Sequence, residues 1–291
     1  MSIKLYIMIC ELDELDELIR LMKNNEPFIF TKFGDGEYEC ASQNYAGKNC
    51  DGDNFTPELR EGLRTAFVNL VKHGAFLGRW FEPHKVDFWE NLITEKGMPK
   101  ESIKWVDYHI FLMDGASIVR SKKIKLYSLI RSSKSYKILL RSSLLVRSDI
   151  LLGIIKTGNV IEIPLDNWFS LDYERVKREI EIILMSEGCS EEVLLIMMGG
   201  MASKVLSSDI LILLDQLKKL KKSKRLTIID IGSGLDLIST KRDSRGNTSY
   251  EDMCERFESI LKEEEEWDRD EMNKKYDYIY KEATNRLGCH K

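Results

Sequence analysis

Short apolar runs alternate about seven times with longer segments of helical periodicity in this chain of 291 residues. A strand that is followed by a helix and then by another strand is typical of a parallel sheet with helices on both faces. Apolar residues at three- and four-residue spacing predict helices over 57–73, 171–187 and 202–222. The predicted strands span 27–33, 75–80, 103–109, 136–140, 160–164, 193–198 and 226–231. We therefore expect an α/β, Rossmann-like fold with a mostly parallel sheet flanked by helices.

The chain is expected to form one α/β domain over residues 1–248 and a helical C-terminal extension over 249–291. The extension is highly charged and has a helical pattern. Its apolar stripe consists of the aromatic residues Trp267, Tyr276, Tyr278 and Tyr280. Such a stripe docks on the domain or on a second copy of it, so a homodimer stays an open alternative.

Charge and composition narrow the classes of partner. The net charge of −4, from 44 basic and 48 acidic residues, gives no general attraction to nucleic acid, and we expect no nucleic-acid partner. The apolar stretch 3–10 is too short to span a membrane, and the acidic run 11–17 follows where a signal peptide would have its cleavage site. The six cysteines show no CxxC spacing, which suits reduced thiols. These features predict a cytoplasmic protein without a transmembrane segment.

Two acids and two glycines follow the first predicted strand directly, in the segment Thr31-Lys32-Phe33-Gly34-Asp35-Gly36-Glu37-Tyr38. In open parallel sheets the ligand lies outside the carboxyl ends of the strands. In a loop, Asp35 and Glu37 can both turn toward one hard cation, and the glycines allow a phosphate to approach the main chain. An ordinary turn uses the same residue types. The segment is therefore a candidate metal and phosphate site, with a plain turn as the alternative.

The ends of other strands supply further candidates. Arg79 follows the second strand and His109 the third, and each is a candidate to face a ligand. The segment 199–204, which contains Gly199, Gly200 and Lys204, opens a helix whose free amides and positive end can receive a phosphate. A tight strand-to-helix turn with a solvated lysine is the alternative interpretation of that segment.

The segment Asp230-Ile231-Gly232-Ser233-Gly234 is similar to the glycine turn with which many methyltransferases hold S-adenosylmethionine. In those enzymes the turn usually follows the first strand, whereas here it follows the last. A permuted methyltransferase stays an alternative function.

Residues 30–38 resemble the RFGDGE signature of the GT-D type glycosyltransferases, a group first described as a domain of unknown function in bacterial protein glycosylation. The resemblance extends over about 26–245. Its weaker blocks are Lys125-Leu126-Tyr127 with Arg131, 160–164 with Asn167-Trp168-Phe169, 195–206 and 229–232.

The resemblance implies a metal-dependent transferase that uses a nucleotide-activated sugar, usually a UDP-sugar, and a glycan or glycoprotein acceptor. It implies that Asp35 and Glu37, as a D-x-E motif, bind Mn²⁺ or Mg²⁺, which neutralises the leaving diphosphate. We assign contacts with the donor to Lys32, Phe33, Gly34, Gly36, Arg79, Gly199, Gly200 and Lys204.

The chain departs from the family pattern at two positions. Lys32 replaces the family arginine and loses the planar fork that binds an anion at two points. Ser233 stands where many members have a histidine. If the reaction inverts the sugar centre, a base must deprotonate the acceptor hydroxyl, and our candidates are Asp236 and His109. A catalytically silent nucleotide-binding protein is a further alternative, because Lys32 replaces the family arginine and the chain shows no clear base.

Overall fold

The computed structural model describes residues 3–43, 47–49, 53–80, 82–112, 117–142, 149–157, 159–164, 166–186, 188–219 and 224–235. Side chains are described for most of these residues. The predicted domain boundary after residue 248 and the predicted C-terminal extension lie outside the described residues.

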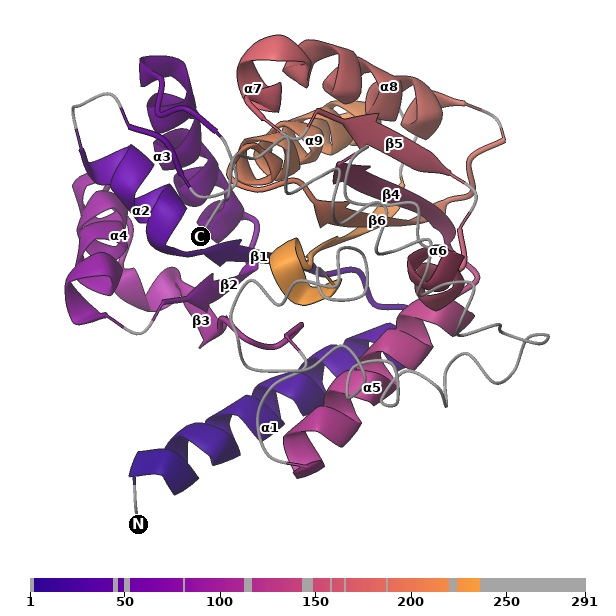
Figure 1. Cartoon of the computed structure of the whole chain (residues 1–291), viewed down its shortest axis with the longest axis horizontal. Helices are drawn as coiled ribbons and strands as arrows, with labels where there is room; N and C mark the ends of the chain where they lie inside the picture. Colours follow the sequence, from indigo (N-terminus) through magenta and orange to yellow (C-terminus); the bar gives the residue numbers. More distant parts are fainter. Residues whose placement is uncertain are drawn as a thin grey trace, which may run out of the picture.

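The strands form one seven-stranded sheet in the order β3-β2-β1-β7-β6-β4-β5, and every neighbouring pair is parallel. Their bounds are β1 (Ile29–Phe33), β2 (Phe76–Arg79), β3 (Lys104–Asp107), β4 (Tyr136–Ser142), β5 (Val160–Ile163), β6 (Glu192–Met198) and β7 (Arg225–Asp230). All seven strands predicted from the sequence are present. Because the strands are parallel, their carboxyl ends lie along one edge of the sheet (Figure 1).

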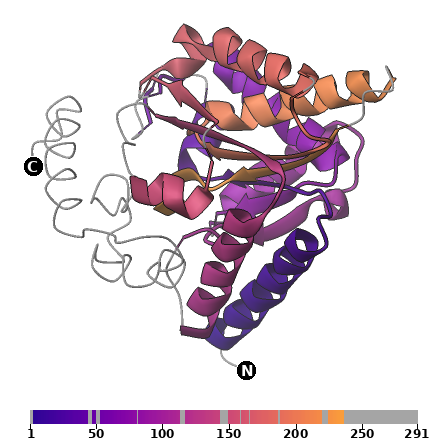
Figure 2. The same cartoon turned by 90° about the vertical axis from the view of Figure 1, so that its right-hand side faces the viewer.

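Helices cover both faces of the sheet, as predicted for an α/β fold (Figure 2). The face covered by α2, α3, α4, α7, α8 and α9 contains one hydrophobic cluster, and the face covered by α1, α5 and α6 contains another. The bounds are α1 (Ile3–Lys23), α2 (Asp35–Ser42), α3 (Pro57–Lys72), α4 (Pro83–Glu95), η1 (Lys100–Ser102), α5 (Ser117–Ser132), α6 (Asp149–Ile155), α7 (Trp168–Leu171), α8 (Tyr173–Met185), α9 (Ala202–Lys219) and η2 (Gly232–Leu235).

The handedness of the crossovers explains which face each helix covers. The chain runs from β1 through β2 to β3 with α3 and α4 on one face, and it reverses through β4 to β5 with α5 and α6 on the other. It then returns through β6 to β7 with α8 and α9 on the first face. Right-handed crossovers require this correlation between direction and face. The helices that follow β6 and β4 therefore leave toward opposite faces. The boundary between these two paired strands is the topological switch point of the sheet.

Helix α3 shows how local sequence determines one of these elements. The Thr56 hydroxyl accepts a hydrogen bond from the N–H of Leu59 at 3.1 Å, and Pro57 occupies the first turn. Both features favour a helix start. The helix ends before Gly74, whose φ of +68° is a conformation that glycine adopts without strain.

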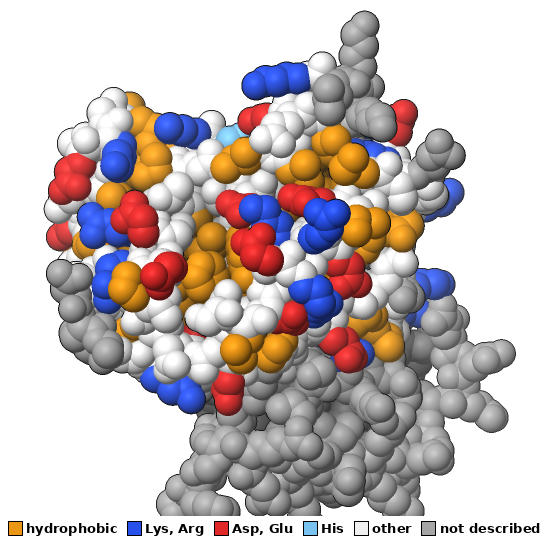
Figure 3. Space-filling view, turned by 90° about the horizontal axis from the view of Figure 1, so that it is seen from above, with side chains coloured by type: hydrophobic (Ala, Val, Ile, Leu, Met, Phe, Trp, Pro, Cys, Tyr) orange, Lys and Arg blue, Asp and Glu red, His pale blue; other side chains and the backbone are white. Residues whose placement is uncertain are grey.

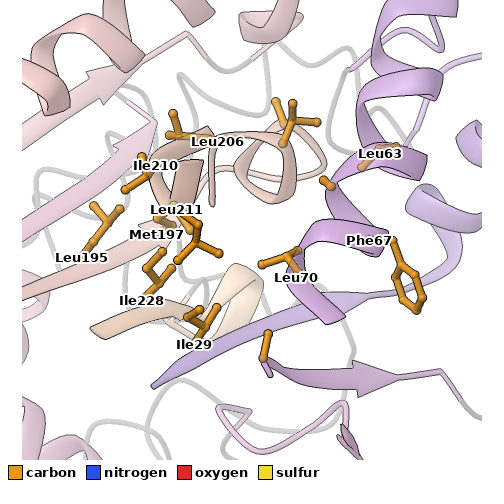
Figure 4. Close-up of a cluster of buried hydrophobic side chains, with 14 of the residues drawn as sticks. Ile29, Leu63, Phe67, Leu70, Leu195, Met197, Leu206, Ile210, Leu211 and Ile228 are labelled. Carbon is orange, nitrogen blue, oxygen red and sulfur yellow. The ribbon is translucent and has the colours of Figure 1, made fainter. Parts of the chain in front are cut away.

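The two faces of the sheet are built by strict alternation along the strands. In β1, Ile29 and Phe33 enter the cluster beneath α3 and α9, whereas Phe30 enters the cluster beneath α1 and α5. Figure 4 shows the first cluster, where side chains of β1, β6 and β7 meet those of α3 and α9. This packing brings α3 and α9 side by side, and so it fixes the helices that follow β1 and β6 against each other.

Figure 3 views the molecule from above Figure 1, the side on which α7 and α8 lie, and shows acidic and basic side chains interspersed with apolar ones. The exposed large apolar residues of α7, α8 and α9 are Leu171, Ile182, Met185 and Ile212. Single apolar side chains among charges are ordinary on a protein surface. Within the part of the chain that the structure describes, no helix combines the length and apolar character needed to cross a membrane.

Helix α1 is anchored to the sheet by a partly buried acid. The Glu14 carboxylate accepts a hydrogen bond of 2.7 Å from the N–H of Asp107 at the end of β3. Burial raises the pKa of Glu14 from 4.5 to about 7, although the Asp107 N–H opposes that shift, and the negative charge of Asp107 adds to it. The positive charge of Arg79 lowers the pKa of Glu14, and the negative charge of Glu11 raises it.

We predict that Glu14→Gln stabilises the protein at pH 8. Because the pKa is raised on folding, the unfolding free energy falls as the pH rises from 4.5 to about 7, and the full cost is present above pH 7. Glutamine keeps the acceptor for the Asp107 N–H and removes the charge. Urea unfolding at pH 8 should show a gain of about 1–3 kcal/mol.

The exposed acid Asp13, on the same helix, provides the control. Asp13→Asn should leave the difference in stability between pH 5 and pH 8 as it is in the natural protein. An equal pH dependence in the Glu14→Gln protein and the natural protein would contradict the assignment.

Candidate functional site

Three segments singled out in the sequence meet at the carboxyl ends of β1, β6 and β7. Glu37 belongs to the segment after β1, Lys204 to the segment after β6, and Asp230 is the last residue of β7. The Lys204 Nζ lies 3.1 Å from Glu37 Oε1 and 2.7 Å from Asp230 Oδ2. All three side chains are buried. One ammonium group thus joins two carboxylates from different parts of the chain.

Asp230 is placed in this network by the alternation of β7. Leu226 and Ile228 point into the cluster beneath α9, so Asp230, two residues further on, points to the same side. Its carboxylate accepts hydrogen bonds from the Thr31 hydroxyl at 3.1 Å and from the Gly232 N–H at 3.0 Å. These bonds compensate a carboxylate whose residue has 0% exposure.

The Lys204 ammonium group has three close oxygen acceptors. Besides the two carboxylates, its ammonium group donates to the Gly200 carbonyl oxygen at 2.9 Å. Burial alone would lower the pKa of Lys204, but the charges of Asp230 and Glu37 outweigh it and hold that pKa above its ordinary value. The sequence interpretation placed this lysine on a bound phosphate. The structure instead directs its ammonium group inward, where it links main chain and carboxylates.

The two acids of the D-x-E motif do not lie in a loop, and that part of the prediction is wrong. Asp35 begins α2, so Asp35 and Glu37 occupy its first turn. Residues two positions apart on a helix differ by about 200° around its axis and face different neighbours. The Glu37 side chain is 9% exposed and faces Lys204, whereas the Asp35 side chain is 48% exposed and pairs with Lys85.

This divergence does not fit one metal ion held by both carboxylates. Among the described residues, no group of three or more His, Cys, Asp or Glu side chains is arranged to hold a metal ion. The dependence on Mn²⁺ or Mg²⁺ implied by the resemblance stays a prediction. Asp35 is the acid of the motif that presents its carboxylate to solvent.

Lys85 on α4 is a neighbour of the motif that the sequence did not reveal. Its ammonium group pairs with Asp35 and lies 2.6 Å from Glu82 Oε2. Burial opposes the charge, but the hydrogen bonds to Asp35 and Glu82 raise the pKa of Lys85. A positive charge therefore stands beside the first turn of α2. No spacing in the sequence connects Lys85 with Asp35, because β2 and α3 separate them.

Two of the predicted donor contacts, Lys32 and Phe33, are the last residues of β1 and lie in the interior. Lys32 is buried, donates to the Ile231 carbonyl oxygen at 2.9 Å and lies 5.0 Å from the centre of the Tyr108 ring. Phe33 packs in the core against Phe67 and Trp89. The side chains of Lys32 and Phe33 are therefore committed to the fold.

Glycine is favoured at two of the main-chain positions of the site. A Cβ atom on Gly34 would lie 2.9 Å from the Tyr108 hydroxyl, so this glycine lets the tyrosine close over the start of α2. A Cβ atom on Gly232 would lie 2.6 Å from the Lys32 Nζ, and its φ of +49° favours glycine as well. Gly36 lies on the same turn of α2, near Asn49 and Met201.

The remaining candidates lie toward β2 and β3 or outside the described residues. Arg79 is exposed at the end of β2. His109 is half-buried, with its ring centre 6.2 Å from that of Trp80 and 5.8 Å from that of Tyr108. Its main-chain N–H donates to Asp107 Oδ1 at 2.6 Å. Asp236 lies outside the described residues.

The topological switch point adds Arg141, a residue that sequence reasoning missed. The turn of Gly199 and Gly200 follows β6 there, and the Trp168 indole N–H donates to the Gly199 carbonyl oxygen at 2.8 Å. Arg141, near the end of β4, is buried, and its Nη2 lies 3.1 Å from Glu162 Oε1. The strand order that creates this switch point is a tertiary property, so no local signal in the sequence marks Arg141.

Comparison with family models, curated proteins and solved structures finds no match to this chain. The assignment of function therefore depends on the geometry of the carboxyl edge together with the resemblance of its motif.

We predict that Asp230→Asn destabilises the protein by about 3 kcal/mol, because removing one partner of a buried ion pair leaves the other insufficiently compensated. Thr31→Val, the matched control, removes one hydrogen bond to the same carboxylate and should cost about 1 kcal/mol. Urea unfolding at pH 7 measures both. Equal costs for the two variants would show that the Asp230 charge contributes little to the network.

Proposed function

We propose that this protein is a glycosyltransferase that moves a sugar from a nucleotide-activated donor, a UDP-sugar in view of the family it resembles, to a hydroxyl of a glycan or glycoprotein. The observation that carries the proposal is the meeting of the glycine-acid segment after β1 with the segments after β6 and β7 in the network of Glu37, Lys204 and Asp230. This meeting point lies at the carboxyl edge of the sheet, where parallel α/β folds bind ligands.

The chemistry of glycosyl transfer suits the groups around α2. Expulsion of a nucleoside diphosphate builds negative charge on the leaving group, which nearby donors and cations stabilise. The first turn of α2 presents main-chain N–H groups and the positive end of the helix. Lys85 adds a cation beside that turn, paired in this structure with Asp35. A bound Mn²⁺ or Mg²⁺ would supply further neutralisation of the diphosphate.

The acceptor side of the proposal involves His109 or Asp236 as a base. The ring of His109 lies against Tyr108, which in turn closes over Gly34 at the start of α2. This contact connects His109 with the glycine-acid segment, so it supports His109 as the first candidate to test. A bell-shaped or sigmoidal pH dependence of turnover would report the protonation of such a base.

The methyltransferase alternative depended on the segment from Asp230 to Gly234. The Asp230 carboxylate accepts hydrogen bonds from the Thr31 hydroxyl and the Gly232 N–H, and it pairs with the Lys204 ammonium group. Its bonding capacity is therefore used within the protein. That arrangement supports a structural role for the acid of this turn. The silent nucleotide-binding protein differs from the proposed enzyme only in turnover.

We predict that UDP with Mn²⁺ raises the melting temperature of the full chain, because a ligand that binds the folded state stabilises it. At a ligand concentration of 100 times the dissociation constant the gain is about 2.7 kcal/mol. A thermal-shift assay with S-adenosylmethionine as the comparison distinguishes the classes. A higher melting temperature with S-adenosylmethionine and an unchanged one with UDP would contradict the glycosyltransferase proposal and favour the methyltransferase.

Asp35→Asn should lower metal-dependent UDP-sugar turnover by at least about 100-fold without changing the melting temperature, because the exposed Asp35 carboxylate is the group that would hold the Mn²⁺ or Mg²⁺ ion. Glu82→Gln is the matched control, since it removes the other carboxylate that pairs with Lys85 and leaves the Lys85 cation in place. If Asp35 acts only as the partner of Lys85, both variants lose turnover equally. Full turnover in the Asp35→Asn protein would remove Asp35 from the proposed mechanism.

A further inference from the structure

Both oxygens of the Glu37 carboxylate are engaged within the protein. Oε2 accepts a hydrogen bond from the Gly34 N–H at 2.9 Å, and Oε1 pairs with the Lys204 ammonium group at 3.1 Å. The side chain is 9% exposed. Glu37 therefore already has a cation and a main-chain donor.

The Lys204 ammonium group is the centre of this arrangement. It has three N–H bonds to donate. Its three close acceptors come from different parts of the structure: Glu37 on α2, Asp230 at the end of β7, and the Gly200 carbonyl oxygen before α9. Two carboxylates around one buried ammonium group form a compensated set, whereas two carboxylates without it would repel each other.

We infer that Glu37 is a positioning residue whose permanent cation is the Lys204 ammonium group, and that it is not a ligand of a metal ion shared with Asp35. In this role Glu37 fixes the first turn of α2 against α9 and β7. The inference concerns the proposed donor site and rests on the proposed function for its biological meaning, but its geometry does not depend on any transfer reaction.

The contacts explain how this positioning works. Glu37 receives the N–H of Gly34, the residue at which the chain leaves β1 and enters α2. The same carboxylate is tied through Lys204 to Asp230, which also accepts from Thr31 inside β1. The direction in which the first turn of α2 presents its amides is thus coupled to two neighbouring strands. The exposed Asp35 has no such link to the sheet through its pair with Lys85.

The test is a double-mutant cycle on the full chain. Glu37→Gln, Lys204→Met and the double variant are unfolded in urea at pH 7. The unfolding equilibrium constant of the double variant should be at least tenfold smaller than the value expected if the effects of the two single substitutions simply multiplied. The reason is that the double variant removes the ammonium group together with one carboxylate. Asp35→Asn with Lys85→Met is the matched pair from the exposed side of the same turn. Its coupling should be below about fivefold.

Two further readouts separate positioning from general stability. Hydrogen exchange of the amides in 34–42 should become at least tenfold faster in the Lys204→Met protein, while exchange in 59–70 of α3 stays unchanged. Binding of Mn²⁺, measured by electron paramagnetic resonance with and without UDP, should differ less than twofold between the Glu37→Gln protein and the natural protein.

A Mn²⁺ affinity that falls tenfold or more in the Glu37→Gln protein would overturn the inference, and so would additive effects of Glu37→Gln and Lys204→Met. If the natural protein binds no Mn²⁺, the inference is tested by the double-mutant cycle and by hydrogen exchange alone. None of these measurements uses sugar transfer. Failure to find turnover therefore counts against the proposed function and leaves this result intact.

Discussion

The ammonium group of Lys204 is the interaction on which the arrangement of the carboxyl edge depends. It is buried between carboxylates that come from the segment after β1 and from the end of β7, and it also binds the turn that leads into α9. Without it, two acids would lie desolvated side by side. A single lysine thus makes three segments of the chain mutually dependent, and one of them, that of Glu37, lies 167 positions before Lys204 (204 − 37).

The sheet supplies the frame in which this network forms. β1 and β7 are neighbours although they are the first and last strands of the described residues, and the alternation of β7 directs Asp230 toward α9. The packing of α3 on α9 holds the helices after β1 and β6 together. Hydrophobic burial therefore positions the charged groups, and the charged groups in turn fix the ends of the elements. Neither could form the site alone.

Asp35 and Glu37 illustrate how adjacent residues of one motif acquire different roles. Their types suggested a common ligand, because a loop would allow both side chains to converge. The helix start at Asp35 separates them around its axis, so one carboxylate enters the buried network and the other meets Lys85 near solvent. Lys204 was likewise expected to bind phosphate from its place at a helix start, but the nearby carboxylates draw its ammonium group inward.

The sequence by itself determined the seven strands, the helices α3, α8 and α9 and the parallel sheet, because strand and helix periodicities are local and each run of apolar residues carries its own period. It also determined which segments reach the carboxyl edge, since the residues that follow each strand do so in any parallel sheet. Only the tertiary structure decided which of these residues meet. The strand order placed β7 beside β1 and made the boundary of β6 and β4, where Arg141 lies, the topological switch point. These contacts between distant residues leave no local pattern in the chain.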